Sequence, residues 1–311
     1  MNKSILRIGT RGSPLALAQA RETRDRLLAA HGWQHDAIEI VVIRTTGDMI
    51  QDRALSEAGG KGLFTKELDI ALADHAIDLA VHSAKDLPTV MPDGIAVPGY
   101  LPREDVRDVL ITRAGGDLHS LPQGAVVGSA SLRRQAQVRK VRPDLQVRLL
   151  RGNVQTRLAK VQAGDFDATL LALAGLKRLG LGHLAMTILD KDQFLPAVGQ
   201  GAVAIAVRRE DDATQQAISL VLDPATGSAL ACERAFLTLL DGSCRTPIAG
   251  HAVLHDRHLD FRGLVLTPDG AESVETFASG PVGDATRLGE EAARDLLSRA
   301  PQHVLAAFRA V

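Results

Sequence analysis

The sequence predicts an α/β fold of two similar lobes, followed by a small α+β domain. Through its first two thirds, short apolar runs typical of strands alternate with amphipathic stretches typical of helices. Such alternation predicts a largely parallel sheet. The same succession of strand, turn and helix then occurs a second time, which indicates a repeat. From about residue 223 the pattern changes to consecutive strands with polar turns and a final helix, as in α+β domains.

In the first lobe, polar residues follow directly on the predicted strands. A strand at 5–10 leads into a turn and a helix, with Ser13 as the N-cap and Pro14 as the first helical residue. Another strand is expected within 77–88. Ligands of α/β proteins gather at the ends of such strands. The polar residues expected there are Arg11, His82, Ser83, Lys85 and Asp86.

The second lobe contains the most basic stretch of the chain, residues 125–158, with seven arginines, one lysine and a single acidic residue, Asp144. The whole chain has 36 Lys plus Arg against 37 Asp plus Glu. The positive charge is therefore concentrated in one region of a nearly neutral protein.

Within this basic stretch, arginines follow two successive strands. Arg133 and Arg134 are expected in the first turn of a helix whose N-cap is Ser129 or Ser131, and Arg151 at the end of the next strand. Cations in a first turn oppose the helix dipole, but guanidinium groups together with free backbone N–H groups can hold carboxylates or phosphates. We therefore expect an anion site. The alternative is a solvated basic surface.

The predicted domain boundaries follow the composition of the chain. Residues 88–105 are rich in Pro and Gly, as expected of a crossing between domains. We predict a first lobe at 1–101 plus about 200–220, a second lobe at 106–196 and a C-terminal α+β domain at 223–311.

The two cysteines differ in their surroundings. Cys232 shares a predicted helical face with Phe236 and other apolar residues, which predicts a buried, inert thiol. Cys244 lies in the loop DGSCRTP beside Arg245, where exposure and a neighbouring cation favour a reactive thiolate.

Composition excludes several functional classes. The chain has seven Phe, one Tyr and one Trp, with a net charge of −1, which argues against a nucleic-acid partner. It has no stretch of membrane-spanning length and no segment typical of a signal peptide, so we expect a cytoplasmic protein.

Two motifs resemble known sites but lack their context. The G-x-G-x-x-A pattern at 199–204 precedes a predicted strand, whereas a dinucleotide-binding loop must follow a strand and open a helix. The histidines His251, His255 and His258 fall on a predicted hairpin, which gives no reason to expect a metal site.

Six separated blocks of the chain form a recognisable series: HSAKDLP at 82–88, GSASLRR at 128–134, LRGNVQTRL at 150–158, AGLKRLG at 174–180, LPAVGQGA at 195–202 and DGSC at 241–244. In this order they resemble the porphobilinogen deaminases, also called hydroxymethylbilane synthases. GTRGSPLALAQA and GGKGLFTKEL near the N-terminus extend the resemblance, so that it covers nearly the whole chain.

The resemblance implies a transferase of porphyrin and haem biosynthesis with two periplasmic-binding-protein-like lobes around a cleft. The family carries a dipyrromethane cofactor, made from two porphobilinogen units and attached by a thioether to the loop cysteine, here Cys244. On this primer it joins four porphobilinogens head to tail with loss of ammonia. It then releases the linear tetrapyrrole by hydrolysis.

The resemblance also implies roles for individual residues. Asp86 is the catalytic group, because a carboxylate beside the pyrrole nitrogens stabilises developing positive charge and moves protons. The arginines hold the acetate and propionate of each pyrrole. The cofactor-binding residues are Cys244, Lys85, Ser83, Ser129, Ser131, Arg133, Arg134, Asp86 and Gln200. The substrate-binding residues are Arg11, Ser13, Arg151, Arg157 and Arg178.

The chain departs from the family pattern at two places, and neither departure affects a residue with a charged role. Ala130 stands where a serine is usual, and the cysteine loop is D-G-S-C where G-G-C is commoner. The competing interpretation is a non-catalytic two-lobed anion-binding protein, which has no need of a reactive cysteine. We expect porphobilinogen as the small-molecule partner, a monomer, and no metal, nucleic acid or membrane.

Overall fold

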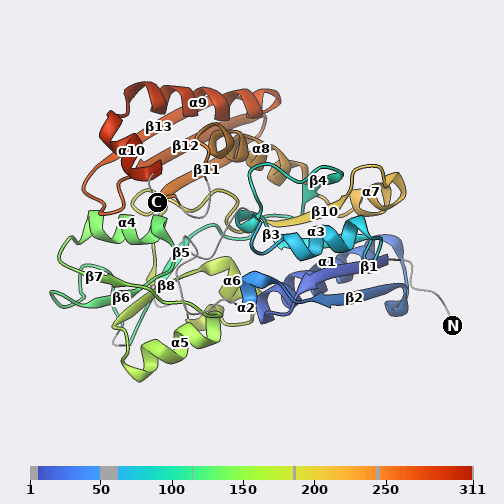
Figure 1. The fold of residues 1–311 in the computed structure, drawn as a ribbon, viewed down its shortest axis with the longest axis horizontal. Helices are drawn as coiled ribbons and strands as arrows, with labels where there is room; N and C mark the ends of the chain where they lie inside the picture. Colours follow the sequence, from blue (N-terminus) through green and yellow to red (C-terminus); the bar gives the residue numbers. More distant parts are fainter. Residues whose placement is uncertain (1–5, 50–61, 114, 185–186, 243–245, 310–311) are drawn as a thin grey trace. The chain divides into compact units, whose positions relative to one another are not determined.

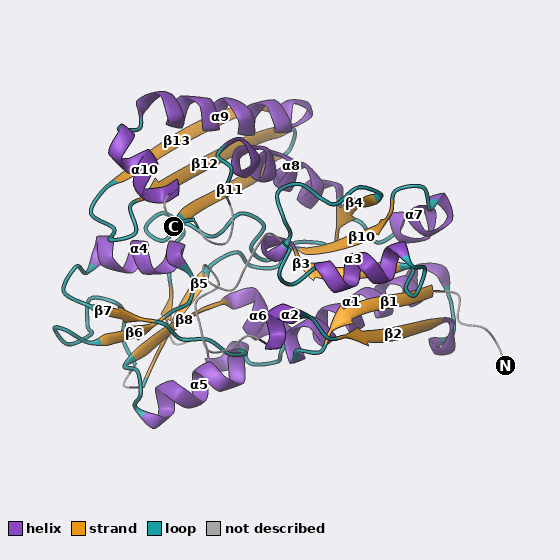
Figure 2. Ribbon diagram, in the orientation of Figure 1, coloured by secondary structure: helices purple, strands orange, loops and turns teal. Residues whose placement is uncertain are grey.

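The computed structural model describes residues 6–49, 62–113, 115–184, 187–242 and 246–309. They form two compact units. The first holds the described residues up to 104 together with 201–227, and the second holds those at 105–200 and from 228 onward. Figures 1 and 2 show the elements of each unit.

The first unit is built on a five-stranded sheet in the order β2-β1-β3-β10-β4. β1 runs parallel to β2 and β3, whereas β10 runs antiparallel to β3 and β4. The strands are β1 (Leu6–Arg11), β2 (Ile38–Ile43), β3 (Leu79–Ser83), β4 (Ile95–Tyr100) and β10 (Val203–Arg208). The helices are α1 (Pro14–His31), α2 (Thr46–Met49), α3 (Lys66–Ala73) and α7 (Asp212–Ser219), with short 3-10 helices η1 (His35–Ala37) and η2 (Ala84–Asp86).

Helix α1 begins and ends where its sequence predicts. The Ser13 side chain accepts a hydrogen bond from the backbone N–H of Ala16 at 3.3 Å, and Pro14 is the first helical residue. Gly32 ends the helix in the left-handed conformation, at φ 65°, which favours glycine. The buried side chains of Ala20 and Leu27, both in α1, pack in the core of the sheet. These contacts fix the turn at 11–13 beside the end of β1.

The second unit contains a five-stranded sheet of the same plan, in the order β7-β6-β8-β5-β9. β6 runs parallel to β7 and β8, and β5 runs antiparallel to β8 and β9. The strands are β5 (Asp108–Thr112), β6 (Val126–Gly128), β7 (Gln146–Arg148), β8 (Ala168–Ala172) and β9 (Thr187–Ile188). The helices are α4 (Leu132–Val141), α5 (Val154–Ala163) and α6 (Leu173–Arg178), with 3-10 helix η3 (Gly182–Leu184).

The two five-stranded sheets correspond strand by strand, in both order and direction. β6, β7 and β8 occupy the positions of β1, β2 and β3, and β5 occupies that of β10. The predicted repeat and the predicted α/β fold class are therefore confirmed. β10 follows the second lobe in the sequence but belongs to the sheet of the first unit, and β5 takes the corresponding position in the second sheet.

The second unit also contains a three-stranded antiparallel sheet with helices against it. Its core includes Phe236, Phe261, Leu296 and the fully buried Cys232. Burial raises the pKa of the Cys232 thiol to about 12, so the predicted inert thiol is confirmed. The elements are β11 (Ile248–His255), β12 (His258–Leu266), β13 (Ser273–Pro281), α8 (Pro224–Leu239), α9 (Ala285–Arg299), α10 (Gln302–Arg309) and 3-10 helix η4 (Val282–Asp284).

β10 follows the glycine-containing turn at 199–202, so the motif there precedes a strand as predicted. The turn between β11 and β12 lies at 256–257, which confirms the hairpin. Within the part of the chain that the structure describes, no helix combines the length and apolar character needed to cross a bilayer.

Candidate active site

In the first unit, polar side chains meet at the carboxyl ends of β1 and β3. The two strands are parallel neighbours, so their carboxyl ends lie at the same edge of the sheet. Arg11 ends β1, and Asp86 lies in η2, directly after β3. Their side chains form an ion pair, with Arg11 Nη1 3.9 Å from Asp86 Oδ2. The Arg11 guanidinium also lies over the Phe64 ring, 4.2 Å from its centre.

These residues line a cavity of about 60 Å³. Gln19 of α1 forms part of its wall and is hydrogen-bonded to Ser83, with Gln19 Nε2 donating to Ser83 Oγ at 2.9 Å. The predicted site residues of this lobe that line it are Arg11, Ser13, Ser83 and Asp86, and Gln19, Phe64 and His82 join them. Lys85 lies beside Asp86 in η2. The structure thus brings together Arg11, Ser13, Ser83 and Asp86, whereas Lys85 does not line the cavity.

His82 was not among the predicted site residues, although the sequence placed it at this strand end. The register of β1 and β3 pairs Gly9 with Ala80, so two residues further on Arg11 lies beside His82. His82 is only 4% exposed, and its Nε2 has no hydrogen-bond partner. Burial, together with the charge of Arg11, lowers the pKa of His82 to about 4. The imidazole is therefore neutral at physiological pH.

We expect this buried imidazole to make the protein less stable in weak acid. The unfolded chain binds a proton at His82 below about pH 6.5 while the folded chain does not until about pH 4, so the free energy of unfolding falls as the pH falls through this window. Between pH 7 and 5 the loss from His82 alone should be roughly 2 kcal/mol.

Urea unfolding of the wild type and of His82→Gln at the two pH values measures this contribution. The variant should lose less stability than the wild type between pH 7 and 5, by about the same 2 kcal/mol. An equal loss in both proteins would show that His82 is protonated alike in the folded and unfolded states.

In the second unit, the start of α4 carries the predicted serines and arginines. Ser131 is the N-cap, and its Oγ accepts from the backbone N–H of Arg134 at 3.5 Å. Ser129 is buried and its Oγ accepts from the N–H of Ser131 at 3.2 Å. Of the two serines that the sequence offered as the N-cap, Ser131 is therefore the correct one.

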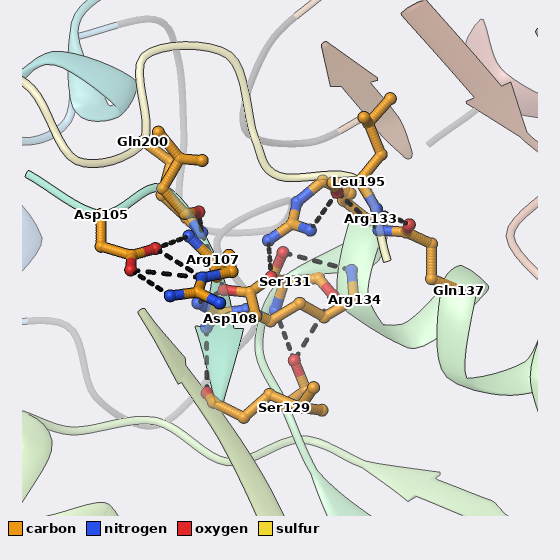
Figure 3. Close-up of polar contacts among 12 residues, drawn as sticks. Asp105, Arg107, Asp108, Ser129, Ser131, Arg133, Arg134, Gln137, Leu195 and Gln200 are labelled. Carbon is orange, nitrogen blue, oxygen red and sulfur yellow. Dashed lines mark hydrogen bonds and ion pairs between the residues drawn. The ribbon is translucent and has the colours of Figure 1, made fainter. Parts of the chain in front are cut away.

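Arg133 and Arg134 share one buried carboxylate, that of Asp108 (Figure 3). Arg133 Nη2 donates to Asp108 Oδ2 and Arg134 Nη2 to Asp108 Oδ1, both at 2.7 Å. Gln200 Nε2 also donates to Asp108 Oδ1, at 2.9 Å. The Asp108 carboxylate is fully buried, and the arginines are 3% and 5% exposed. Three predicted cofactor-binding residues from distant parts of the sequence thus meet at one group.

Asp108 was not among the predicted site residues. The sequence does contain an indication of its role, because an acidic residue directly before the apolar run VLIT is unusual at the start of a buried strand. Burial alone would raise the pKa of Asp108, but the charges and hydrogen bonds of Arg133 and Arg134 hold it well below the usual range of an aspartate. Asp108 is therefore ionised at physiological pH, and it cancels one of the two arginine charges.

The two guanidinium groups retain buried donors that the protein does not use. Arg133 Nη1 donates to the carbonyl of Leu195 at 2.7 Å, and Arg134 Nη1 to that of Leu170 at 3.0 Å. The Nε atoms of both arginines are buried and have no hydrogen-bond partner. Buried donors are rarely left without an acceptor. The pair also carries two positive charges, of which the carboxylate of Asp108 cancels one.

The remaining predicted arginines lie on neighbouring elements of the same lobe. Arg151 follows β7, Arg157 lies in α5 and Arg178 ends α6, and all three are half-buried. Arg157 Nε donates to the carbonyl of Gly152 at 3.0 Å. Cys244 lies outside the described residues. No group of three or more potential metal ligands occurs within the described ranges.

The sequence of this chain matches known proteins over nearly its whole length. Residues 6–216 match the family model described as the dipyrromethane cofactor binding domain of porphobilinogen deaminase, and residues 228–298 match the C-terminal domain of that enzyme. The chain belongs to the porphobilinogen deaminase family. It is 58% identical over 301 residues to the porphobilinogen deaminase of Nitrobacter winogradskyi, with 97% of this chain and 95% of that relative covered.

A second porphobilinogen deaminase, from Paracoccus denitrificans, is 52% identical over 296 residues, with 95% of each chain covered. Among solved structures, the chain is similar to the periplasmic aliphatic sulphonate binding protein of Escherichia coli at 16% identity, with a TM-score of 0.42 over 76% of this chain and 70% of that one.

Membership of the porphobilinogen deaminase family confirms the resemblance seen in the sequence. It also confirms the expectation of a transferase of tetrapyrrole biosynthesis with a dipyrromethane cofactor. The competing interpretation, a non-catalytic anion-binding protein, is not favoured, because the matched family is one of enzymes.

Proposed function

We propose that this chain condenses four molecules of porphobilinogen head to tail and releases hydroxymethylbilane, with Asp86 as the catalytic residue and Cys244 as the attachment point of the cofactor. In each condensation the aminomethyl carbon of one porphobilinogen bonds to the free α-carbon of a terminal pyrrole. The carbon–nitrogen bond breaks, the amine leaves as ammonia, and the α-carbon loses its proton. Water releases the finished tetrapyrrole.

The observation that carries the proposal is the buried pair Arg133 and Arg134 with its unused Nε donors and single counter-charge. Every pyrrole of the substrate bears an acetate and a propionate, so the ligand presents several carboxylates to fixed guanidinium groups. A dipyrromethane bound there would supply the pyrrole α-carbon to which the first substrate is joined. The residues present therefore fit this cofactor.

Asp86 is proposed to stabilise the positive charge that develops on pyrrole nitrogen during each condensation. A carboxylate placed before the reaction needs no reorganisation when the charge appears, and it can also accept or return a proton. Its ion pair with Arg11 fixes the carboxylate at the cavity wall. Arg11 in turn has a guanidinium that can bind a substrate carboxylate.

The other site residues are proposed in two groups. Those proposed to hold the cofactor are Cys244, Lys85, Ser83, Ser129, Ser131, Arg133, Arg134, Asp86 and Gln200. Those proposed to hold incoming substrate are Arg11, Ser13, Arg151, Arg157 and Arg178. The cysteine belongs to a proposed third domain at 223–311.

We also propose that the enzyme works as a cytoplasmic monomer, with porphobilinogen as its partner and without nucleic acid or membrane. The net charge of −1 and the small number of aromatic residues support this proposal. A single monomeric species in light-scattering measurements would agree with it.

The function is tested with the purified chain and porphobilinogen. We expect ammonia and tetrapyrrole to form in a ratio of four to one, and the intact mass of the protein to exceed that of the polypeptide by two linked pyrrole units. A protein of bare polypeptide mass that still makes the tetrapyrrole would overturn the covalent cofactor. A cofactor-loaded protein that releases no ammonia would overturn the reaction.

Replacing an arginine of the site by lysine should not be conservative. A lysine ammonium carries its donors on a single atom, so a lysine side chain at position 133 or 134 could not reach both Asp108 and the backbone carbonyl, which the two Nη atoms of an arginine reach separately.

We expect Arg133→Lys and Arg134→Lys to carry at least tenfold less cofactor, whereas Arg151→Lys keeps the cofactor and elongates at least tenfold more slowly. Arg139→Lys is the matched control, because Arg139 lies in the same helix and donates to the carbonyl of Pro268. Wild-type loading and turnover in all three site variants would mean that these arginines bind neither cofactor nor substrate.

A further inference from the structure

A single carboxylate organises the arginine pair. Asp108 begins β5 and pairs with Ala172 of β8 in the sheet. Its two oxygens accept from Arg133, Arg134 and Gln200 at 2.7 to 2.9 Å, as Figure 3 shows. Because a guanidinium group is planar, holding Nη1 on a carbonyl and Nη2 on Asp108 also fixes the direction of its Nε–H bond.

The arrangement is not that of an ordinary buried ion pair. One carboxylate would compensate one guanidinium, yet two arginines are buried around Asp108, and each keeps an Nε without an acceptor. A buried charge without a partner is costly. One net positive charge therefore remains on the pair beside Asp108.

We infer that Asp108 is a positioning residue for the cofactor: it holds Arg133, Arg134 and Gln200 in the orientation that receives the dipyrromethane carboxylates. It cancels one arginine charge and leaves the other for the ligand. The inference rests on the proposed function and adds to it a residue that acts through others.

The Gln200 contact extends this role to a second segment. Gln200 Nε2 also donates to the carbonyl of Val106 at 2.7 Å. The neighbouring Gly199 N–H donates to the buried carboxylate of Glu233 in α8 at 2.7 Å. The turn that carries Gln200 is therefore held on one side by Asp108 and on the other by α8. We expect a change at Asp108 to disturb Gln200 as well as the two arginines.

The test compares Asp108→Asn with Asp78→Asn. Asp78 is the matched control, because it too is a carboxylate between two arginines: Arg7 Nη2 lies at 2.8 Å and Arg208 Nη2 at 3.7 Å from its Oδ1. It lies in the first unit, at the start of β3 and outside the proposed site. Both variants lose the charge of a carboxylate that lies beside two guanidinium groups, so both should melt at a lower temperature than the wild type.

The readout that separates positioning from stability is the fraction of folded molecules that carry the cofactor. The folded monomer peak from size exclusion is collected, and its intact mass gives that fraction. We expect at least a tenfold lower loaded fraction in Asp108→Asn and a wild-type fraction in Asp78→Asn. The inference fails if folded Asp108→Asn is loaded like the wild type, or if both variants lose cofactor in proportion to their loss of melting temperature.

A variant that keeps the charge covers the case in which Asp108→Asn yields no folded protein. Asp108→Glu retains the counter-charge but moves the carboxylate by one methylene, so it should fold and still load at least severalfold less cofactor. Wild-type loading of Asp108→Glu would then overturn the inference. If the wild-type protein carries no cofactor, the proposed function itself is overturned. If the wild type and the Asp108 variants carry the cofactor equally, only the role of Asp108 is overturned.

Discussion

Cys244→Ala is expected to give a folded protein with the mass of the bare polypeptide, 33.1 kDa, and no measurable synthesis of tetrapyrrole. Without the thiol, no covalent bond can hold the primer, so the first condensation has no anchored acceptor. Intact mass spectrometry, colour with an acidic aldehyde reagent for pyrroles, and turnover of porphobilinogen measure the three expected losses.

Cys232→Ala is the matched control for the loss of a thiol. Cys232 is fully buried in the core around Phe236 and Phe261, so its replacement removes a small apolar group at a cost of order 1 kcal/mol in stability. Cofactor content and turnover should remain those of the wild type. A Cys244→Ala protein that still carries two pyrrole units would move the attachment point elsewhere in the chain.

Asp86→Asn is expected to lower turnover by on the order of a hundredfold or more, the size expected when such a charge is deleted. The amide keeps the shape of the carboxylate and its place beside Arg11 but removes the charge that stabilises the pyrrole cation. Single-turnover measurement of ammonia release, on protein whose cofactor content has been determined by mass, isolates this step from any defect in loading.

Asp86→Glu is the companion variant, because it retains the charge and displaces it by one methylene. We expect its turnover to lie between those of the wild type and Asp86→Asn. Near-normal turnover in cofactor-loaded Asp86→Asn would remove Asp86 from the mechanism and leave the arginines without an identified catalytic partner.

The local elements and their polar ends could be predicted because short-range chemistry specifies them. Ser13 with Pro14, and Ser131 before the helix it caps, are signals contained within a few residues. The strand ends that carry Arg11, Asp86 and Arg151 follow from the same alternation of apolar and polar residues. Parallel pairing then brings strand ends of each lobe to one edge of its sheet.

What could not be predicted depends on contacts between distant residues. Asp108 meets Arg133 and Arg134 across 25 and 26 residues, and Gln200 across 92, separations at which no local pattern operates. The sequence placed both arginines in the first turn of α4, which is correct, but their burial results from packing against β5 and β8. The isolation of His82 Nε2 is likewise a property of the assembled core.

The position of β10 has a consequence for the order in which the chain can fold. β4 pairs with β10, and β3 pairs with β10 on its other side, so the sheet of the first unit requires residues 203–208. A nascent chain that has emerged as far as residue 200 already contains every strand of the second five-stranded sheet but leaves β4 without its hydrogen-bonded neighbour. The lobe that is synthesised first is thus completed after the second lobe, and until residues 203–208 have been added its sheet has open strand edges that can pair with another chain.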